Sequence, residues 1–268
     1  MLVISGNPFD SAQLSGEYAQ DSVERQVLTT MSNSSDRYKF ATTNQLRFEL
    51  DLRREIVNSA LDLSDSRFGF ATFHDSECNE DYWKRSANGG FKLKSGVIPS
   101  EGLEDIYLNG GKYASECATA MVIVFYKAVL NVFGAAQFNR LFPSIYLMNW
   151  HSIDPILREI GSPRETGDIM LGDRGYFRNP EVDPKTPEWQ GENVIILPES
   201  LYYGHGIGVM GGDRIIRALN ANRKKNATQS AYLMDAVSRP NYKRIAELFN
   251  NAAPRTASLQ WRAFPAPL

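Results

Sequence analysis

The clearest helical pattern lies in residues 42–61. Thr42 and Gln45 have the spacing of a capping box, in which two side chains bond the free backbone N–H groups at the start of a helix. Apolar residues then return every three or four positions, which is the period of one helix face. The apolar positions are Leu46, Leu50, Val57, Ala60 and Leu61, and the charged positions expected to face solvent are Arg53, Arg54 and Glu55. The pattern predicts a long helix with one face in the core.

A second helix is predicted where the chain is apolar at nearly every position, from Ala118 to Phe133. A helix that is apolar all round is normally buried. Lys127 interrupts the run, which is also shorter than the ~20 residues needed to cross a bilayer. Ser115 has a side chain typical of an N-cap and is expected to begin this helix.

The strand patterns are shorter and are bounded by glycine, asparagine or proline. The predicted strands cover residues 68–73, 81–84, 91–94, 144–149, 193–197 and 202–210. A further helix is predicted at 214–224 with Asp213 as its N-cap, and two short helices after it, the last with Pro240 in its first turn. Because helices and strands do not alternate regularly, the pattern favours the α+β class.

The chain is predicted to form one domain over residues 1–250. Residues 8–40 are polar with weak periodicity, so residues 1–40 are expected to be a peripheral N-terminal region of short helices and loops. Residues 251–268 contain three prolines and no periodic pattern, which is typical of a flexible C-terminal tail.

The composition of the chain excludes some classes of function. Of the 268 residues 43% are hydrophobic and 22% charged, which suits a globular protein with a sizeable core. The net charge of −2 gives no basic excess for nucleic acid or an anionic membrane. With only Cys78 and Cys117 present, a disulfide framework is not expected, and the first residues lack the basic segment of a signal peptide. An intracellular protein is therefore predicted.

Cys117 is the most informative single residue. If Ser115 caps the apolar helix, Cys117 lies in the first turn, where free N–H groups and the helix dipole favour a negative charge on sulfur. A free thiol has a pKa of about 8.5, and lowering it by about two units would make the thiolate the major form at neutral pH. A catalytic nucleophile is one interpretation of Cys117. The other is a small buried residue with a purely structural role.

A nucleophilic thiol needs a proton acceptor, and the chain has three histidines. His74 lies in a polar loop and His151 follows a predicted strand, where a local hydrogen bond is expected. His205 lies between glycines, which allow backbone or substrate to approach closely, and is the best candidate base. Glu192 stands at the start of a predicted strand. If that strand pairs with 202–210, Glu192 and His205 can converge, although a solvated strand end is the ordinary place for a glutamate.

Around these residues the sequence resembles a known family, the small calcium-independent transglutaminases that cross-link spore coat proteins in spore-forming bacteria. The resemblance covers roughly residues 40–240. It lies in the segments 113–120 (Tyr-x-x-Glu-Cys-Ala-Thr-Ala), 171–184 (Leu-Gly-Asp-x-x-Tyr-Phe-x-Asn-Pro-Glu-x-Asp-Pro), 189–195 (Trp-x-Gly-Glu-Asn-Val-Ile), 203–208 (Tyr-x-His-Gly-x-Gly), 223–225 and 229–233. The chain departs from the family at Asn149, where the resemblance implies an acidic residue.

The resemblance implies a papain-like cysteine-hydrolase core with Cys117 as nucleophile and Glu192 and His205 as acid and base. It also implies glutamine- and lysine-bearing protein substrates, with spore coat proteins foremost, and a place in the spore coat or the mother-cell cytoplasm. No cofactor or metal is expected, because neither a calcium-binding loop nor a dinucleotide motif is present.

Residues that would contact substrate lie beside each motif. Aromatic side chains that could line a tunnel for a lysine side chain, or else belong to the core, are Phe70, Trp150, Tyr176, Phe177 and Trp189. Glu116 could draw the cationic lysine inward, or simply stabilise the helix start through the dipole. Two alternatives remain open for the whole protein. One is a cysteine amidase or peptidase on the same core, and the other is a coat component without catalytic activity.

Overall fold

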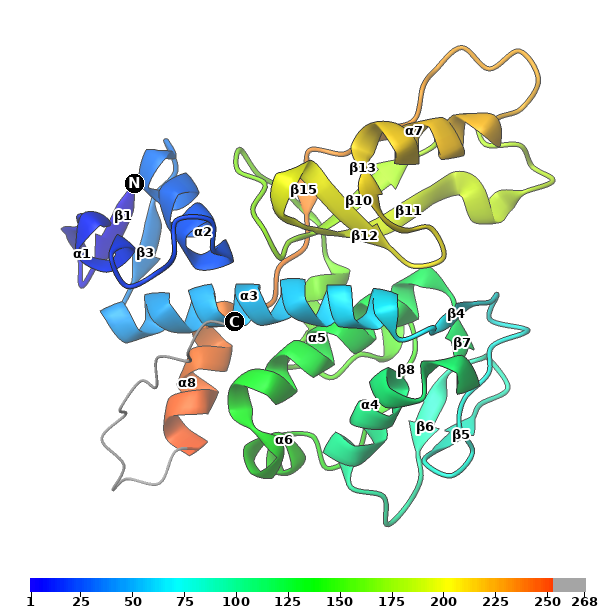
Figure 1. Cartoon of the computed structure of the whole chain (residues 1–268), viewed down its shortest axis with the longest axis horizontal. Coiled ribbons are helices and arrows are strands. Elements are labelled where there is room, and N and C mark those ends of the chain that lie inside the picture. Colours follow the sequence, from blue (N-terminus) through cyan, green and yellow to red (C-terminus); the bar gives the residue numbers. More distant parts are fainter. Residues whose placement is uncertain (253–268) are drawn as a thin grey trace.

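One long helix, α3 (Thr43–Asp65), forms the axis of the computed structural model, which describes residues 1–252. Figure 1 shows α3 crossing the molecule, with a β-sheet layer above it and a helical layer below it. The helical layer contains α5 (Cys117–Phe133), which packs against α3 in the main apolar core. The two helices predicted from the apolar patterns are therefore confirmed.

The start of α3 follows the predicted capping, but its two faces differ from the prediction. The Thr42 hydroxyl accepts the N–H of Gln45 at 3.2 Å. Arg53, expected in solvent, is fully buried, whereas Leu61, expected in the core, is 39% exposed. Arg53 donates to the carboxylate of Asp173 at 2.8 Å, 120 residues further along the chain. A pattern of local spacing cannot predict such a distant partner, so this part of the prediction was wrong.

The sheet layer is five-stranded and antiparallel throughout. In spatial order its strands are β13 (Gly208–Gly211), β12 (Leu201–Gly204), β11 (Gly191–Ile196), β10 (Arg174–Arg178) and β14 (Tyr232–Leu233). The strand near 193–197 does pair with its successor, the condition for Glu192 and His205 to converge, since Val194 pairs with Gly204. Helix α5 packs against β11, which confirms the predicted α+β class with a buried helix on an antiparallel sheet.

The predicted single strand over 202–210 is in fact a hairpin. Strand β12 ends at Gly204, the chain turns through residues 205–207, and β13 returns with Gly208 paired to Gly204. Gly206 and Gly208 have φ values of 94° and 76°, in the left-handed region that favours glycine. The glycines therefore form a turn where the prediction had an extended strand, and the turn places His205 at the end of the sheet.

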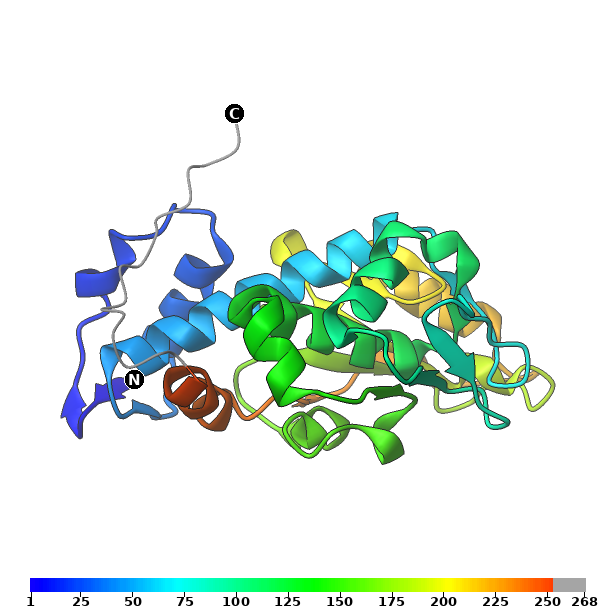
Figure 2. The same cartoon turned by 90° about the horizontal axis from the view of Figure 1, so that it is seen from below.

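The N-terminal elements lie at one end of α3 in both views (Figure 1 and Figure 2). They are β1 (Leu2–Ile4), β2 (Asn7–Pro8), α1 (Ala12–Ser15), α2 (Val23–Asn33) and β3 (Tyr38–Phe40). Short helices were predicted here, but the small sheet in the order β2-β1-β3 was not. The two strands of this sheet that are far apart in the sequence, β1 and β3, are each only three residues long, which is too short to show a periodic pattern.

The remaining elements surround these layers. The strands are β4 (Gly69–Phe70), β5 (Trp83–Arg85), β6 (Phe91–Leu93), β7 (Ala114–Ser115), β8 (Tyr146–Leu147), β9 (Arg164–Glu165) and β15 (Ala236–Val237). The helices are α4 (Pro99–Leu108), α6 (Ala135–Leu141), α7 (Gly212–Ala221) and α8 (Tyr242–Ala252), with short 3₁₀ turns at Gly110–Lys112, Trp150–Ser152, Arg158–Gly161, Pro187–Gln190 and Pro198–Ser200.

The C-terminal half differs from the prediction in detail. Helix α7 has Gly211 as its N-cap, not Asp213, and one helix rather than two follows it within residues 1–252. Pro240 precedes that helix, α8, instead of lying in its first turn. Helix α8 includes Asn251 and Ala252, and the rest of the predicted tail lies outside the described residues. None of the helices within residues 1–252 combines the length and apolar character that a membrane-crossing helix requires.

Candidate active site

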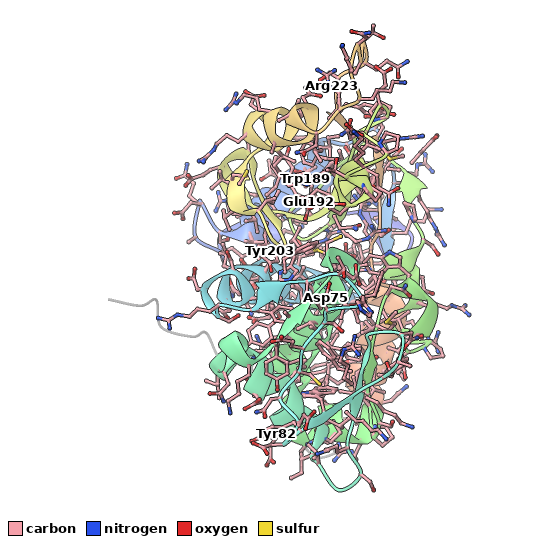
Figure 3. The ribbon with its side chains drawn as sticks, turned by 90° about the vertical axis from the view of Figure 1, so that its right-hand side faces the viewer. Asp75, Tyr82, Trp189, Glu192, Tyr203 and Arg223 are labelled. Carbon is pink, nitrogen blue, oxygen red and sulfur yellow. The ribbon has the colours of Figure 1, made fainter. Side chains whose placement is uncertain are left out.

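A cavity of about 640 Å³ opens where the N-terminus of α5 meets the edge of the sheet layer, and Cys117, Glu192 and His205 all line it. Figure 3 shows Glu192 beside Trp189 on the face of the molecule where the sheet and helical layers meet. The three residues come from α5, β11 and the turn after β12. The structure therefore brings together the three side chains that were predicted as the reacting groups.

Cys117 is the first residue of α5, but the residue that caps the helix is Glu116 and not Ser115. The Glu116 carboxylate accepts the N–H groups of Ala118 and Thr119 at 2.6 and 2.7 Å. Ser115 ends the short strand β7 instead. The N–H groups that were expected to stabilise a thiolate are thus occupied by a carboxylate, which places a negative charge next to the sulfur.

The Cys117 thiol consequently differs from the predicted thiolate. Burial and, after it, the negative charges of Glu192 and Glu116 raise the pKa of Cys117 to about 12, while a hydrogen bond from Asn193 acts in the opposite direction. The expectation of a lowered pKa was wrong, because desolvation and two nearby carboxylates disfavour the thiolate. The sulfur is nevertheless partly exposed to the cavity. It rests as a neutral thiol that needs a base.

Asn193 is a site residue that the sequence did not single out. Its side-chain Nδ2 donates to the Sγ of Cys117 at 3.3 Å. Asn193 follows Glu192 directly in β11 and was part of the segment that carried the family resemblance. That neighbourhood was the one available signal, since an asparagine in a strand has no distinctive pattern of its own.

Glu192 is the carboxylate best placed to act on the thiol. Its side chain is nearly buried, and Oε1 has no hydrogen-bond partner among the described residues. Burial and, after it, the charge of Glu116 raise the pKa of Glu192 to about 8, against a smaller lowering by the backbone N–H of His205. A carboxylate with a pKa near neutrality can both accept and return a proton, as general acid–base catalysis requires.

The His205 imidazole is held by contacts on both ring nitrogens. Nε2 lies 3.0 Å from the carbonyl oxygen of Gly69, so Nε2 carries the proton, and Nδ1 lies 3.3 Å from the Tyr203 hydroxyl, which donates to it. The ring stacks on Phe68 with centroids 4.7 Å apart. Burial lowers the pKa of His205 to about 4, so the ring is neutral at physiological pH.

Most of the predicted substrate-contacting residues line the cavity. These are Glu116, Phe70, Trp150, Tyr176 and Trp189. Phe70 is 46% exposed, which is unusual for a phenylalanine and places its ring at the opening. Phe177 does not line the cavity. Its ring is buried in the apolar layer between the sheet and α7, against Tyr202, so the core interpretation holds for this residue.

The structure offers no site for a metal within residues 1–252, where no group of three His, Cys, Asp or Glu side chains is arranged to hold an ion. His74 is exposed in its loop and does not itself line the cavity, although its neighbour Phe73 does. The groups that the cavity itself presents include a thiol, a carboxylate with a raised pKa and an amide donor. This set can form and resolve an acyl-thioester.

Comparison with known proteins identifies relatives along nearly the whole chain. Residues 1–249 match the family model described as protein-glutamine gamma-glutamyltransferase. Proteins of that description from Bacillus cereus (strain B4264) and Bacillus anthracis (strain CDC 684) are each 40% identical over 257 residues, which cover 96% of this chain and 92% of theirs. A transglutaminase structure from Geobacillus stearothermophilus, without its C-terminal extension, superposes with a TM-score of 0.73 at 45% identity, over 77% of this chain and 98% of that one.

Proposed function

The chain belongs to the protein-glutamine gamma-glutamyltransferase family, and on this basis we propose that it joins protein glutamines to lysine amines through a thioester on Cys117. The observation that supports the mechanism is the meeting of Cys117 with the nearly buried carboxylate of Glu192 in one cavity. The product is an ε-(γ-glutamyl)lysine isopeptide bond.

In the first half of the proposed reaction, Glu192 takes the proton of the Cys117 thiol and the sulfur attacks the γ-carboxamide carbon of a glutamine. A C–S bond forms, and the C–N bond breaks as the protonated Glu192 returns its proton to the leaving nitrogen. Ammonia is released and the thioester remains. Because the thiol rests neutral, the attack and the proton transfer have to occur together, which suits a base with a pKa of about 8.

In the second half, a lysine amine replaces ammonia. A lysine ammonium has an ordinary pKa of about 10.4 and is not nucleophilic until it loses a proton. The Glu192 carboxylate accepts that proton and releases it to solvent, and the neutral amine then attacks the thioester carbon. The ionised Glu192 takes the second proton from the attacking nitrogen and passes it to the sulfur as the C–S bond breaks, which restores the thiol. The negative charge of Glu116 at the cavity wall favours entry of the cationic lysine, although its oxygens also cap α5.

We include His205 as the third member of the site. Its main-chain N–H bonds the Glu192 carboxylate, and its ring forms part of the cavity wall. Acid–base work on the imidazole itself requires the ring to release Gly69 or Tyr203 first. These contacts favour a role in which His205 holds Glu192 and shapes the cavity.

Transfer prevails over hydrolysis only if water is kept from the thioester. The rings of Phe70, Trp150 and Trp189 line the cavity together with the aliphatic Ile207. Such a lining accepts the alkyl chain of a lysine and disfavours ordered water. This apolar lining is what supports a transferase over an amidase or peptidase with the same reacting groups.

A labelled primary amine and a glutamine-bearing protein test this proposal. We expect the label to enter the protein covalently, with ammonia released in step with it, and without added calcium. Release of ammonia with no incorporated amine, leaving glutamate in place of glutamine, is the result of an amidase and would contradict the proposal. Absence of both products would favour a coat component without catalytic activity.

We further propose that the natural substrates are spore coat proteins, a proposal supported by the resemblance of the motifs around Cys117 and by relatives from Bacillus species. Coat extracts from spores that lack this protein should incorporate the labelled amine when the purified protein is added, and cytosolic extracts from the same cells should incorporate much less. Equal labelling of the two extracts, compared at matched protein concentration, would contradict a coat-directed role.

A further inference from the structure

Arg174, at the start of β10, is a buried cation without a carboxylate partner among the ion pairs of the described residues. Its Nε donates to the carbonyl oxygen of Ile160 at 2.9 Å, and Nη2 donates to the Ser238 hydroxyl at 2.6 Å. The guanidinium also lies over the ring of Trp150, 4.4 Å from its centroid. All of these partners are neutral.

A buried charge with only neutral partners is unfavourable for folding alone. This cost of burying the charged form also acts on the ionisation of the arginine, because burial lowers the pKa of Arg174 to about 10. Arg53 is buried as deeply, but it has the carboxylates of Asp173 and Glu49. The difference between the two arginines indicates that Arg174 has a role outside packing.

The remaining hydrogen bond of Arg174 is made to a residue of the active site. Nη1 donates to Oδ1 of Asn193 at 2.6 Å, and Nδ2 of the same amide donates to the Sγ of Cys117 at 3.3 Å. A guanidinium has donors only, so it can bond nothing but the oxygen end of the amide. Turned by 180°, the amide would present NH₂ to the guanidinium and its oxygen to the sulfur. Arg174 therefore decides which end of Asn193 faces Cys117.

We propose that Arg174 is a positioning residue of the reaction, which fixes Asn193 so that its amide N–H faces Cys117 and stabilises the developing negative charge on sulfur. The inference deepens the proposed function and rests on it for the role of Cys117. The charged and titratable groups that act on this sulfur or lie beside it are Glu116, Glu192 and Tyr176, which are negative or neutral, and Arg174, which is positive.

The positive charge of Arg174 acts on the sulfur directly, by Coulomb attraction, and also through the amide of Asn193. A hydrogen bond to a charged group is stronger than one to a neutral group, so the bond from Asn193 strengthens as the proton leaves the thiol. Polarisation of the amide by Arg174 adds to this effect. The bond thus acts most strongly on the charged sulfur, both when Cys117 attacks and when the thioester is broken.

The test is the pH dependence of Cys117 alkylation by iodoacetamide, read by mass spectrometry of the Cys117 peptide so that Cys78 does not contribute. Arg174→Met is expected to shift the profile upward by about one pH unit, which is about tenfold slower alkylation at a fixed pH below the thiol pKa. Asn193→Ala is expected to give the same shift. In amine incorporation, kcat should fall by a similar factor while KM changes little.

Arg178→Met is the matched control, because Arg178 lies on the same strand but is exposed. Its alkylation profile should equal that of the wild type. If Arg174→Met does not fold, Arg174→Lys carries the test, since it keeps the charge but cannot make the three bonds of a guanidinium. A smaller upward shift supports the proposal. An unchanged profile in the folded arginine variants overturns it.

The double variant Arg174→Met/Asn193→Ala tests whether the effect passes through the amide. We expect Cys117 in the double variant to be alkylated only slightly more slowly than in Asn193→Ala alone, because the direct attraction to Arg174 is lost as well. A further tenfold loss would overturn the proposed path. Alkylation does not require glutamine or amine. A failure of this inference therefore differs from a failure of the proposed function, which would appear as a wild-type protein that alkylates normally but incorporates no amine.

Discussion

Replacing Cys117 with alanine is expected to lower amine incorporation by at least about a thousandfold, since no other side chain in the cavity can form the thioester. The fold should be retained. Alanine suits the first turn of a helix, and the sulfur is partly exposed, so the free energy of unfolding should change by less than about 1 kcal/mol. Initial rates of incorporation and a denaturant unfolding curve measure the two effects.

Cys78→Ala is the matched control for this variant, because Cys78 is the second cysteine of the chain and does not line the cavity. The control should keep the wild-type rate. If Cys117→Ala retained more than about a tenth of the activity while folded, the assignment of the nucleophile would be wrong. Loss of activity in both variants would indicate damage to the fold instead of to the reaction.

The resting state of the site follows from how α5 begins. A helix that starts with free N–H groups attracts a thiolate, but here Glu116 occupies those groups and adds a negative charge. The Cys117 thiol therefore rests protonated, with a raised pKa, and an ionised Glu192 has to take its proton during the attack. A neutral thiol is a poor target for oxidants and alkylating agents. The same arrangement makes the reaction depend on Glu192, because the dipole alone cannot generate the nucleophile.

The sequence predicted those features of the site that depend on local patterns. The apolar run after Ala118 placed Cys117 at the mouth of a buried helix, and two apolar segments predicted strands that would let Glu192 and His205 converge if they paired, as they do. Both inferences need only the period of a helix or strand and short connections between elements. They were confirmed for this reason.

The features that the sequence did not predict depend on partners far apart in the chain. Arg53 was assigned to solvent because its carboxylate partner, Asp173, lies 120 residues away. The role of Asn193 depends on its hydrogen bonds with Arg174 and Cys117, and the spacing of these residues in the sequence does not indicate that they meet. The sequence could not show which of the neighbours Tyr176 and Phe177 lines the cavity and which lies in the core. Adjacent strand residues point to opposite faces of a sheet, but the pattern did not indicate which face borders the cavity.

The sequence also could not predict whether the pKa of Cys117 is raised or lowered, for a different reason. The helix dipole favours a lower pKa, whereas the burial of the sulfur and the charges of Glu116 and Glu192 raise it, and only the geometry of the site decides the outcome. The sequence suggested the first of these effects. The structure supplied the others, which together raise this pKa.

The pH dependence of the reaction should follow Glu192. Its carboxylate must be ionised to accept the thiol proton, and its pKa is raised to about 8 by burial. Activity should therefore rise as the pH is increased through about 8, and below that value it should fall about tenfold for each pH unit. In Glu192→Gln the rate should drop by about 10²- to 10⁴-fold, and the rise near pH 8 should disappear, because glutamine cannot accept the proton.

Glu199→Gln serves as the control, since Glu199 is exposed, lies beyond the end of β11 and does not line the cavity. It should keep both the rate and the pH profile of the wild type. His205→Ala should also lower the rate, because the turn that bonds Glu192 loses its ring contacts with Phe68 and Gly69. The rise near pH 8 should move in this variant but should not vanish. Full activity in the Glu192→Ala/His205→Ala double variant would contradict the assignment of both residues, and a rise near pH 8 that persists in Glu192→Gln would show that another group accepts the proton.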